Sequence, residues 1–153
     1  MKIFLSGWIV LKIYLSGSIR GGRELQSNYQ IIYDYLQNNG HEVLTHHVAS
    51  PDVIEIENSM TNAEIYTQDI NWLQMCDIVI AEVSIPSLGV GYEIAYALHL
   101  NKPVLGVYEV KRVISAMILG NTSPNLTLHS YNSISQLLFQ IANYIKVISN
   151  QNS

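Results

Sequence analysis

An uninterrupted apolar stretch near the middle of the chain limits the folds available to it. Residues 77–83 read DIVIAEV, with four consecutive apolar residues at the centre. A strand with one solvent-facing side alternates apolar and polar residues, whereas a strand in a parallel sheet is covered on both faces and reads as a continuous apolar run. The stretch therefore predicts a buried parallel strand with helices packed on both sides.

Strand and helix signals alternate along the rest of the chain. Repeated strand–helix units predict an α/β fold of one domain, a doubly wound (flavodoxin- or Rossmann-like), five-stranded, mostly parallel sheet with helices on both faces. Ligands bind such sheets at the carboxyl ends of the strands. We expect further strands at 12–17, 43–44, 103–108 and 125–129, helices at 24–38, 61–76, 87–100, 111–119 and 133–148, and an irregular polar loop at 48–60.

The first residues contain a near-duplication. Residues 2–7 read KIFLSG and residues 12–17 read KIYLSG, but only the second copy leads into a loop rich in glycine and arginine. We therefore interpret 12–17 as the first core strand, 12–149 as the domain and 150–153 as a flexible tail. Residues 1–11 are then an extension, an expression scar or an extra edge strand.

Composition excludes several classes of function. The net charge of −4 offers no long-range attraction to a nucleic-acid polymer or an anionic membrane, and no run of 18 uncharged apolar residues is present. Hydrophobic residues make up 48% of the chain, enough for a well-buried core and an apolar surface for a partner subunit. The single cysteine, Cys76, has no internal disulfide partner, which favours a reducing, cytoplasmic location.

The loop after the first core strand reads GSIRGGR at residues 17–23. Its glycines allow the backbone to approach a ligand closely, and the N–H groups at the start of a helix bind anions. The loop has neither the GxGxxG spacing nor the Gly-Lys-Ser/Thr ending of a P-loop. It is therefore either a phosphate- or sugar-binding loop or a tight turn with surface arginines.

A second glycine-rich segment, PSLGVGYE at residues 86–93, directly follows the buried strand. Ser87 can cap the next helix, and the amides of Gly89 and Gly91 can face an anion. Glu93 falls near the start of that helix among small and apolar neighbours. It is either a surface glutamate stabilised by the helix dipole or a carboxylate that points into the cleft to attack an electrophilic carbon.

Asp69 lies on an apolar helix face, because its neighbours one turn away are Ile65, Tyr66, Trp72 and Leu73. A carboxylate there is costly unless it is paired or functional. It is either a core aspartate bonded to a backbone N–H or to Tyr14, or the partner of Glu93. Enzymes that cleave glycosidic bonds commonly use two carboxylates in one cleft.

His46 and His47 follow the second expected strand and can donate to a ligand. Adjacent strand residues point to opposite faces, and no His, Cys or carboxylate spacing completes a metal site. We therefore expect neither a metal nor a cofactor.

Six ordered runs resemble the 2′-deoxynucleoside 5′-phosphate N-hydrolases of the nucleoside 2-deoxyribosyltransferase superfamily. The resemblance covers residues 12–145 and implies hydrolysis of a deoxynucleoside monophosphate to free base and 2-deoxyribose 5-phosphate by a homodimer. The runs are KIYLSGSIRGGR (12–23), LTHHVA (44–49), QDINWL (68–73), DIVIAEV (77–83), PSLGVGYE (86–93) and ISAMILG (114–120).

The resemblance also implies roles for individual residues. Glu93 corresponds to the nucleophile that attacks C1′, Asp69 to the carboxylate that assists departure of the base, and Tyr14 to the tyrosine that orients the catalytic carboxylate. Ser115, Ala116 and Met117 correspond to the segment that the neighbouring subunit inserts into the phosphate site. The other implied substrate contacts are Gly17, Ser18, Ile19, Arg20, Gly21, Gly22, Arg23, His47, Ser87 and Gly89.

Two positions depart from the family pattern. His46 replaces a glutamate, and Leu119 replaces an arginine, which removes a positive charge near the expected phosphate site. Two rival functions remain open: a deoxyribosyltransferase, which passes the sugar to a second base instead of water, and a nucleotide-binding sensor without chemistry.

Overall fold

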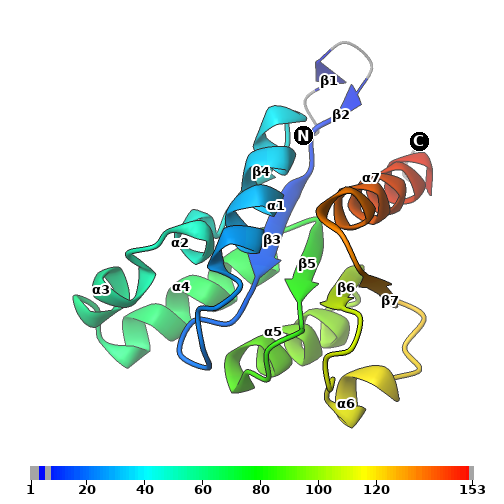
Figure 1. Ribbon diagram of the computed structural model, residues 1–153. Helices are drawn as coiled ribbons and strands as arrows, with labels where there is room; N and C mark the ends of the chain where they lie inside the picture. Colours follow the sequence, from blue (N-terminus) through cyan, green and yellow to red (C-terminus); the bar gives the residue numbers. More distant parts are fainter. Residues whose placement is uncertain (1–3, 6–7, 152–153) are drawn as a thin grey trace.

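The computed structural model describes residues 4–5 and 8–151 and contains the expected five-stranded sheet (Figure 1). All neighbouring strands of this sheet are parallel. Their order, β4-β3-β5-β6-β7, is that of a flavodoxin-like doubly wound sheet, which confirms the predicted fold class. The strands are β3 (Lys12–Ser16), β4 (Glu42–Val43), β5 (Ile78–Glu82), β6 (Val104–Glu109) and β7 (Leu126–Tyr131).

Among the described residues, four long helices cover the two faces of the sheet (Figure 1). Helices α1 (Gln26–Asn38) and α7 (Ile134–Gln151) pack on one face, and α4 (Asn62–Met75) and α5 (Leu88–His99) pack on the other. The three short helices are α2 (His46–Ala49), α3 (Val53–Asn58) and α6 (Ala116–Leu119).

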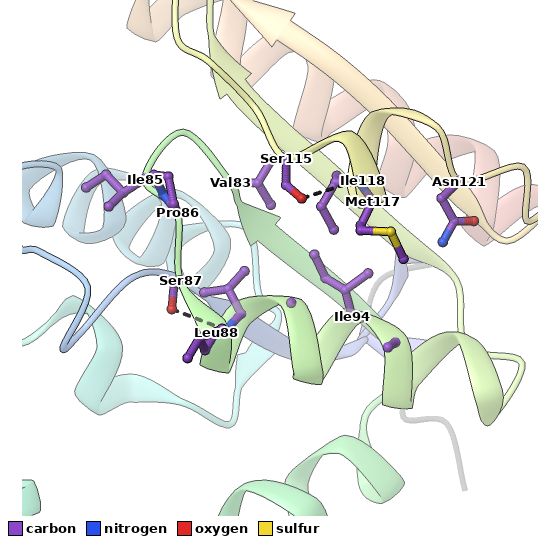
Figure 2. A pocket seen from close by; sticks show the side chains of 13 residues that line it. Val83, Ile85, Pro86, Ser87, Leu88, Ile94, Ser115, Met117, Ile118 and Asn121 are labelled. Atoms are coloured by element: carbon purple, nitrogen blue, oxygen red, sulfur yellow. Dashed lines mark hydrogen bonds between the residues drawn. The ribbon is translucent and has the colours of Figure 1, made fainter.

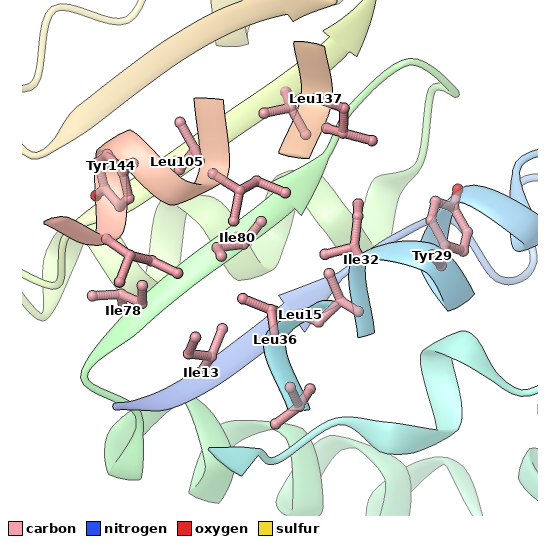
Figure 3. Packing of buried hydrophobic residues seen from close by; sticks show 14 of the residues in the cluster. Ile13, Leu15, Tyr29, Ile32, Leu36, Ile78, Ile80, Leu105, Leu137 and Tyr144 are labelled. Atoms are coloured by element: carbon pink, nitrogen blue, oxygen red, sulfur yellow. The ribbon is translucent and has the colours of Figure 1, made fainter. Parts of the chain in front are cut away.

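Alternation along the strands divides the core in two. Ile13 and Leu15 of β3, with Ile78 and Ile80 of β5, face α1 and α7 and are fully buried (Figure 3). The intervening Tyr14, Val79 and Ala81 face α4 and α5. Both faces of β3 and β5 are thus covered, as the apolar run at 77–83 predicts. Tyr14 and Ser16, which lie two residues apart on the same face of β3, consequently point towards the α4–α5 layer.

Residues 48–60 were expected to be an irregular loop, and this prediction was wrong. They contain the end of α2 and the whole of α3. Val53 and Glu57 are four residues apart on the buried side of α3, while Ile54 and Ile56 are exposed. The apolar periodicity of this helix is therefore hidden, because a glutamate occupies one of its buried positions.

The expected helix at 111–119 is shorter than predicted and begins only at Ala116. Near the N-terminus, β1 (Phe4–Leu5) and β2 (Trp8–Ile9) pair antiparallel in a separate sheet, so they do not add an edge strand to the main sheet. Ser6 and Gly7 of the near-duplicated copy lie outside the described residues. The expected tail at 150–153 is helical as far as Gln151, and its last two residues also lie outside that range.

The strand order reverses between β3 and β5, because the chain runs outward to β4 and then crosses back to β5. The carboxyl ends of β3 and β5 form the crevice where doubly wound sheets bind ligands. Both glycine-rich segments start at this edge. In the described part of the chain, no helix combines the length and apolarity needed to cross a membrane.

Candidate active site

Glu93 lies in the second turn of α5 and is directed at β3. Ser87 caps the helix by accepting a hydrogen bond from the Val90 amide at 3.4 Å. The Ser16 hydroxyl donates to Oε2 of Glu93, and the Tyr14 hydroxyl also interacts with the carboxyl. Strand β3 therefore supplies two hydroxyl groups, two residues apart, that orient one partly buried carboxylate.

Burial changes the ionisation of these groups. Loss of hydration raises the pKa of Glu93 to about 7, even though the hydrogen bonds from Ser16 and Tyr14 favour its charged form; the negative charge of Asp69 raises it further. Burial and the adjacent Glu93 likewise keep the pKa of the Tyr14 hydroxyl well above its usual value. Tyr14 therefore remains a proton donor to Glu93 near neutral pH.

Asp69 lies in the middle of α4, whose start is fixed by a capping box between Thr61 and Glu64. Burial, and secondarily the charge of Glu57, raise the pKa of Asp69 to about 6. No residue in the described ranges hydrogen-bonds to the Asp69 side chain, so it is not the satisfied core aspartate that the sequence left open. A carboxyl group that holds its proton close to neutral pH is suited to general acid–base work.

Asp69 and Glu93 line the same cavity of about 530 Å³. This volume lies within the range of small-molecule sites. The cavity is bounded by the loop after β3, the beginnings of α4 and α5, and the buried side of α3. Its lining consists of Gly17, Ile19, Arg20, Gly21, Glu57, Asn62, Ile65, Asp69, Pro86, Ser87, Leu88, Gly89, Val90 and Glu93.

The loop at 17–23 packs against the start of α5. A Cβ atom at Gly21 would lie 2.8 Å from the carbonyl oxygen of Pro86, and one at Gly17 would lie 2.9 Å from the Tyr29 ring. Both positions therefore exclude any larger residue without a shift of the neighbouring atoms. The glycines bring the loop close enough to form one wall of the cavity.

Arg23 holds this loop in place. Its guanidinium donates to the backbone carbonyls of Ser18, Val48 and Ser50 and lies over the Tyr29 ring. Arg23 is absent from the cavity lining, and so are Ser18 and Gly22. Ser18 is fully buried, and its backbone amide donates to the Tyr29 hydroxyl.

His46 and His47 lie in α2, not in a strand. The His47 ring stacks on Trp72 with 5.4 Å between centroids, and burial lowers its pKa to about 4. Its Nδ1 atom is buried and has no partner among the described residues, and the side chain does not line the cavity. Over the same residues, no group of three or more histidine, cysteine or carboxylate side chains is placed to hold a metal ion.

Figure 2 shows a second cavity, of about 370 Å³, which adjoins the first at the start of α5. The two share Pro86, Ser87, Leu88 and Val90. Ser115 and Met117 of the same chain line this second cavity, opposite Ser87 in Figure 2, whereas exposed Ala116 does not. Within one chain, Ser115 and Met117 therefore line the second cavity beside the start of α5 but do not line the Asp69–Glu93 cavity.

Comparison with known proteins identifies the family. The family sequence model described as nucleoside 2-deoxyribosyltransferase matches residues 13–138. The chain belongs to this family. The match spans all five strands of the main sheet except Lys12, together with both glycine-rich segments, Asp69 and Glu93.

Relatives within the family share much of the sequence. A protein of Methanosarcina mazei with the provisional name 2′-deoxynucleoside 5′-phosphate N-hydrolase 1 is 44% identical, covering 96% of this chain and 91% of its own. The 5-hydroxymethyl-dUMP N-hydrolase of Rattus norvegicus is 46% identical, covering 71% of this chain and 68% of its own. A CMP N-glycosidase from Clostridium botulinum shares the fold, with a TM-score of 0.67 at 21% identity, over 87% of this chain and 98% of that one.

Ser16, which hydrogen-bonds to Glu93, and Glu57, which lines the cavity, were not singled out from the sequence. Ser16 follows Tyr14 at the strand period of two, and this spacing was a usable signal that both hydroxyls face one side. Glu57 gave no usable signal, because its helix was taken for a loop. It lines the cavity of this family member and is ion-paired with Arg20, with 3.2 Å between Nε and Oε2.

Proposed function

We propose that the chain hydrolyses the N-glycosidic bond of 2′-deoxynucleoside 5′-monophosphates, giving free base and 2-deoxyribose 5-phosphate. One observation carries the proposal: Asp69 and Glu93, both with raised pKa values, share a cavity that also opens on the N-terminus of α5. The names of the relatives in Methanosarcina mazei and Rattus norvegicus support the same reaction.

In the proposed first step, ionised Glu93 attacks C1′ and forms an ester with the sugar. The C1′–N bond breaks as Asp69 transfers its proton to the departing base. Ser16 and Tyr14 hold the attacking carboxyl in one orientation. In the second step, Asp69, now a carboxylate, takes a proton from water. The water oxygen attacks C1′ and displaces Glu93, so that the sugar phosphate leaves with retained configuration.

The 5′-phosphate is assigned to the start of α5. Gly89 lies in the first turn, Ser87 caps the helix, and both line the Asp69–Glu93 cavity. Free backbone amides and the helix dipole favour a dianion there. Phosphate binding at this point positions C1′ against Glu93 and contributes to catalysis at a distance from the reacting bond.

A second copy of the chain is proposed to complete the phosphate site with its Ser115. The region around the second cavity is unusually apolar for a surface: Leu88 is 97% exposed, Val113 88% and Met117 82%. Such a patch favours burial in an isologous dimer. Dimer formation would bring the Ser115 segment of one chain to the α5 start of the other.

The proposal is tested with a panel of ribo- and deoxynucleoside monophosphates, measuring free base and sugar phosphate as products. Equal amounts of free base and 2-deoxyribose 5-phosphate are expected from the deoxynucleotides. A new nucleoside formed when a second base is added would instead identify a deoxyribosyltransferase. Tight binding of every nucleotide without product would identify a sensor and overturn the assignment of Glu93 as nucleophile.

The dependence of kcat/KM on pH is expected to be bell-shaped. The reaction needs Glu93 ionised and Asp69 protonated, and their pKa values in the free protein are about 7 and about 6. Glu93 takes up a proton below about pH 7, and Asp69 loses its proton above about pH 6. The reactive combination is therefore a minor form that is most populated near about pH 6.5, and activity falls on both sides of that pH. Initial rates at low substrate from pH 5 to 8.5 measure the profile. A rate that stays constant down to pH 5 would contradict the role of Glu93.

If each active site is completed by the other chain of the dimer, two inactive variants should regain activity when their chains are mixed. Ser115→Asp places a negative charge against the phosphate, and Glu93→Gln removes the nucleophile. A mixed dimer of the two has one intact site, made from Glu93 of the first variant and Ser115 of the second. Random mixing in equal amounts should restore roughly a quarter of wild-type activity, because half the dimers are mixed and each has one working site.

The rescue is measured on co-expressed chains, with each variant alone as the baseline. Thr122→Asp, an exposed change beyond the second cavity, is the matched control and should retain activity. Activity in the mixture no higher than the mean of the two separate variants would show that Ser115 acts within its own chain or not at all.

A further inference from the structure

The end of the cavity farthest from α6 is built around a buried carboxylate. Glu57 of α3 is 6% exposed, although glutamate is among the residues least often buried. Arg20 reaches it from the loop after β3, and its Nε donates to Oε2 at 3.2 Å. Asn62 and Ile65, from the start of α4, complete this end of the cavity.

The position of this group relative to the reacting centre follows from the fold. Along the carboxyl edge of the sheet, α3 and α6 lie at opposite ends, with the start of α5 between them (Figure 1). On the proposed function, on which this inference rests, the phosphate lies at the α5 start and C1′ at Glu93. Asp69 protonates the departing base, so the base lies on the α4 side. Beyond Asp69 on that side, the cavity is lined by Ile65, Asn62 and Glu57.

The Arg20–Glu57 pair presents a donor and an acceptor side by side. Within the described residues, only Oε2 of Glu57 receives a hydrogen bond, and the Nη groups of Arg20 donate to no protein atom. The Arg20 side chain is 61% exposed. The free Oε1 can accept from a ring N–H, while an Nη–H group donates to a neighbouring carbonyl oxygen.

We infer that Glu57 and Arg20 select bases in which a ring N–H adjoins a carbonyl group, namely uracil, thymine, guanine and hypoxanthine. Cytosine and adenine present an unprotonated ring nitrogen beside an amino group. Their lone pair would face the Glu57 carboxylate, and their amino hydrogens would face the Arg20 guanidinium. Arg20, expected from the sequence to contact substrate in a phosphate-binding loop, thereby acts on the base.

Two pairs of substrates isolate this recognition. dUMP and dCMP differ only in the relevant edge of the base, and so do dIMP and dAMP. The wild-type protein should show at least a roughly tenfold higher kcat/KM for dUMP and dIMP than for their partners. Glu57→Gln should bring each ratio to within about threefold of unity, because an amide can either accept from a ring N–H or donate to a ring nitrogen.

Ratios are the decisive readout, because Glu57 also acts on the catalytic groups. Its charge contributes to the raised pKa of Asp69 and also to that of Glu93. That effect is common to every substrate and cancels in the ratio. Glu55→Gln, the same charge change at an exposed position of α3, is the matched control and should leave the ratios unchanged. Thermal unfolding of each variant verifies that the fold is retained.

The possible results separate this inference from the proposed function. Base release from all four nucleotides, with wild-type ratios near unity or with ratios that Glu57→Gln leaves unchanged, would overturn base selection and leave the hydrolase intact. Calorimetric binding of the same nucleotides covers the remaining case. A binding preference that Glu57→Gln abolishes, without base release by any protein, would support recognition and overturn hydrolysis. Equal binding of all four without release would overturn both.

Discussion

Glu93→Gln is expected to lower the rate of base release from a deoxynucleoside monophosphate by at least about a thousandfold. The amide has nearly the shape of the carboxyl but no charge with which to attack C1′. The measurement is single-turnover release of base with enzyme in excess over nucleotide. Glu55→Gln is the control for the change of charge. A variant that turns over within tenfold of the wild type would exclude Glu93 as the nucleophile.

The same substitution should stabilise the folded protein at alkaline pH. The folded-state pKa of Glu93, about 7, lies above its ordinary value of 4.5, so folding favours the protonated form. The stabilising contribution is complete below pH 4.5 and is lost as the pH rises through 7. Gln cannot ionise and avoids this loss. Urea unfolding at pH 8 should therefore show a gain of about 3 kcal/mol over wild type, and little or none at pH 4.5.

Asp69→Asn is expected to reduce base release by about 10²–10⁴-fold for nucleotides with ordinary bases. The amide cannot transfer a proton, so the base must leave as an anion. The same variant should lose the alkaline limb of the pH profile, since the group that deprotonates there is gone. Steady-state rates across pH 5 to 8.5 measure both effects.

A substrate whose base needs no protonation provides the critical comparison. In a 7-methylguanine deoxynucleotide the base already carries a positive charge and leaves as a neutral molecule. Asp69→Asn should cleave it at a rate close to wild type, whereas Glu93→Gln should not. Equal losses by Asp69→Asn on methylated and unmethylated substrates would show that Asp69 acts by positioning and not by proton transfer.

The architecture was readable from the sequence because its signals are local. The apolar run at 77–83 needs cover on both faces, and the alternation of strands and helices then leaves few arrangements. Helix α3 was not predicted from the sequence, because its apolar periodicity is interrupted by a glutamate that is buried through a tertiary contact. The buried Glu57 is ion-paired with Arg20, which is 37 residues away in the sequence. No local pattern reports such a pair.

The site was predictable at the level of segments more than of contacts. Asp69 was singled out by its apolar surroundings, and its raised pKa agrees with that interpretation. The role of Glu93 rested on the family resemblance, because a glutamate near the start of a helix is common on surfaces. Arg23 was placed among the substrate contacts because its loop resembles the family's substrate-binding loop. Its three bonds to backbone carbonyls were invisible, since they depend on where α2 packs.

The bonds of Arg23 have a consequence for substrate capture. These hydrogen bonds hold the loop at 17–23 against the segment around α2 in the absence of ligand. A loop that is already ordered loses little conformational entropy when it closes around a ligand, so more of the contact energy remains as affinity. On the proposed function, Arg23 contributes to nucleotide binding by holding one wall of the cavity in place in advance.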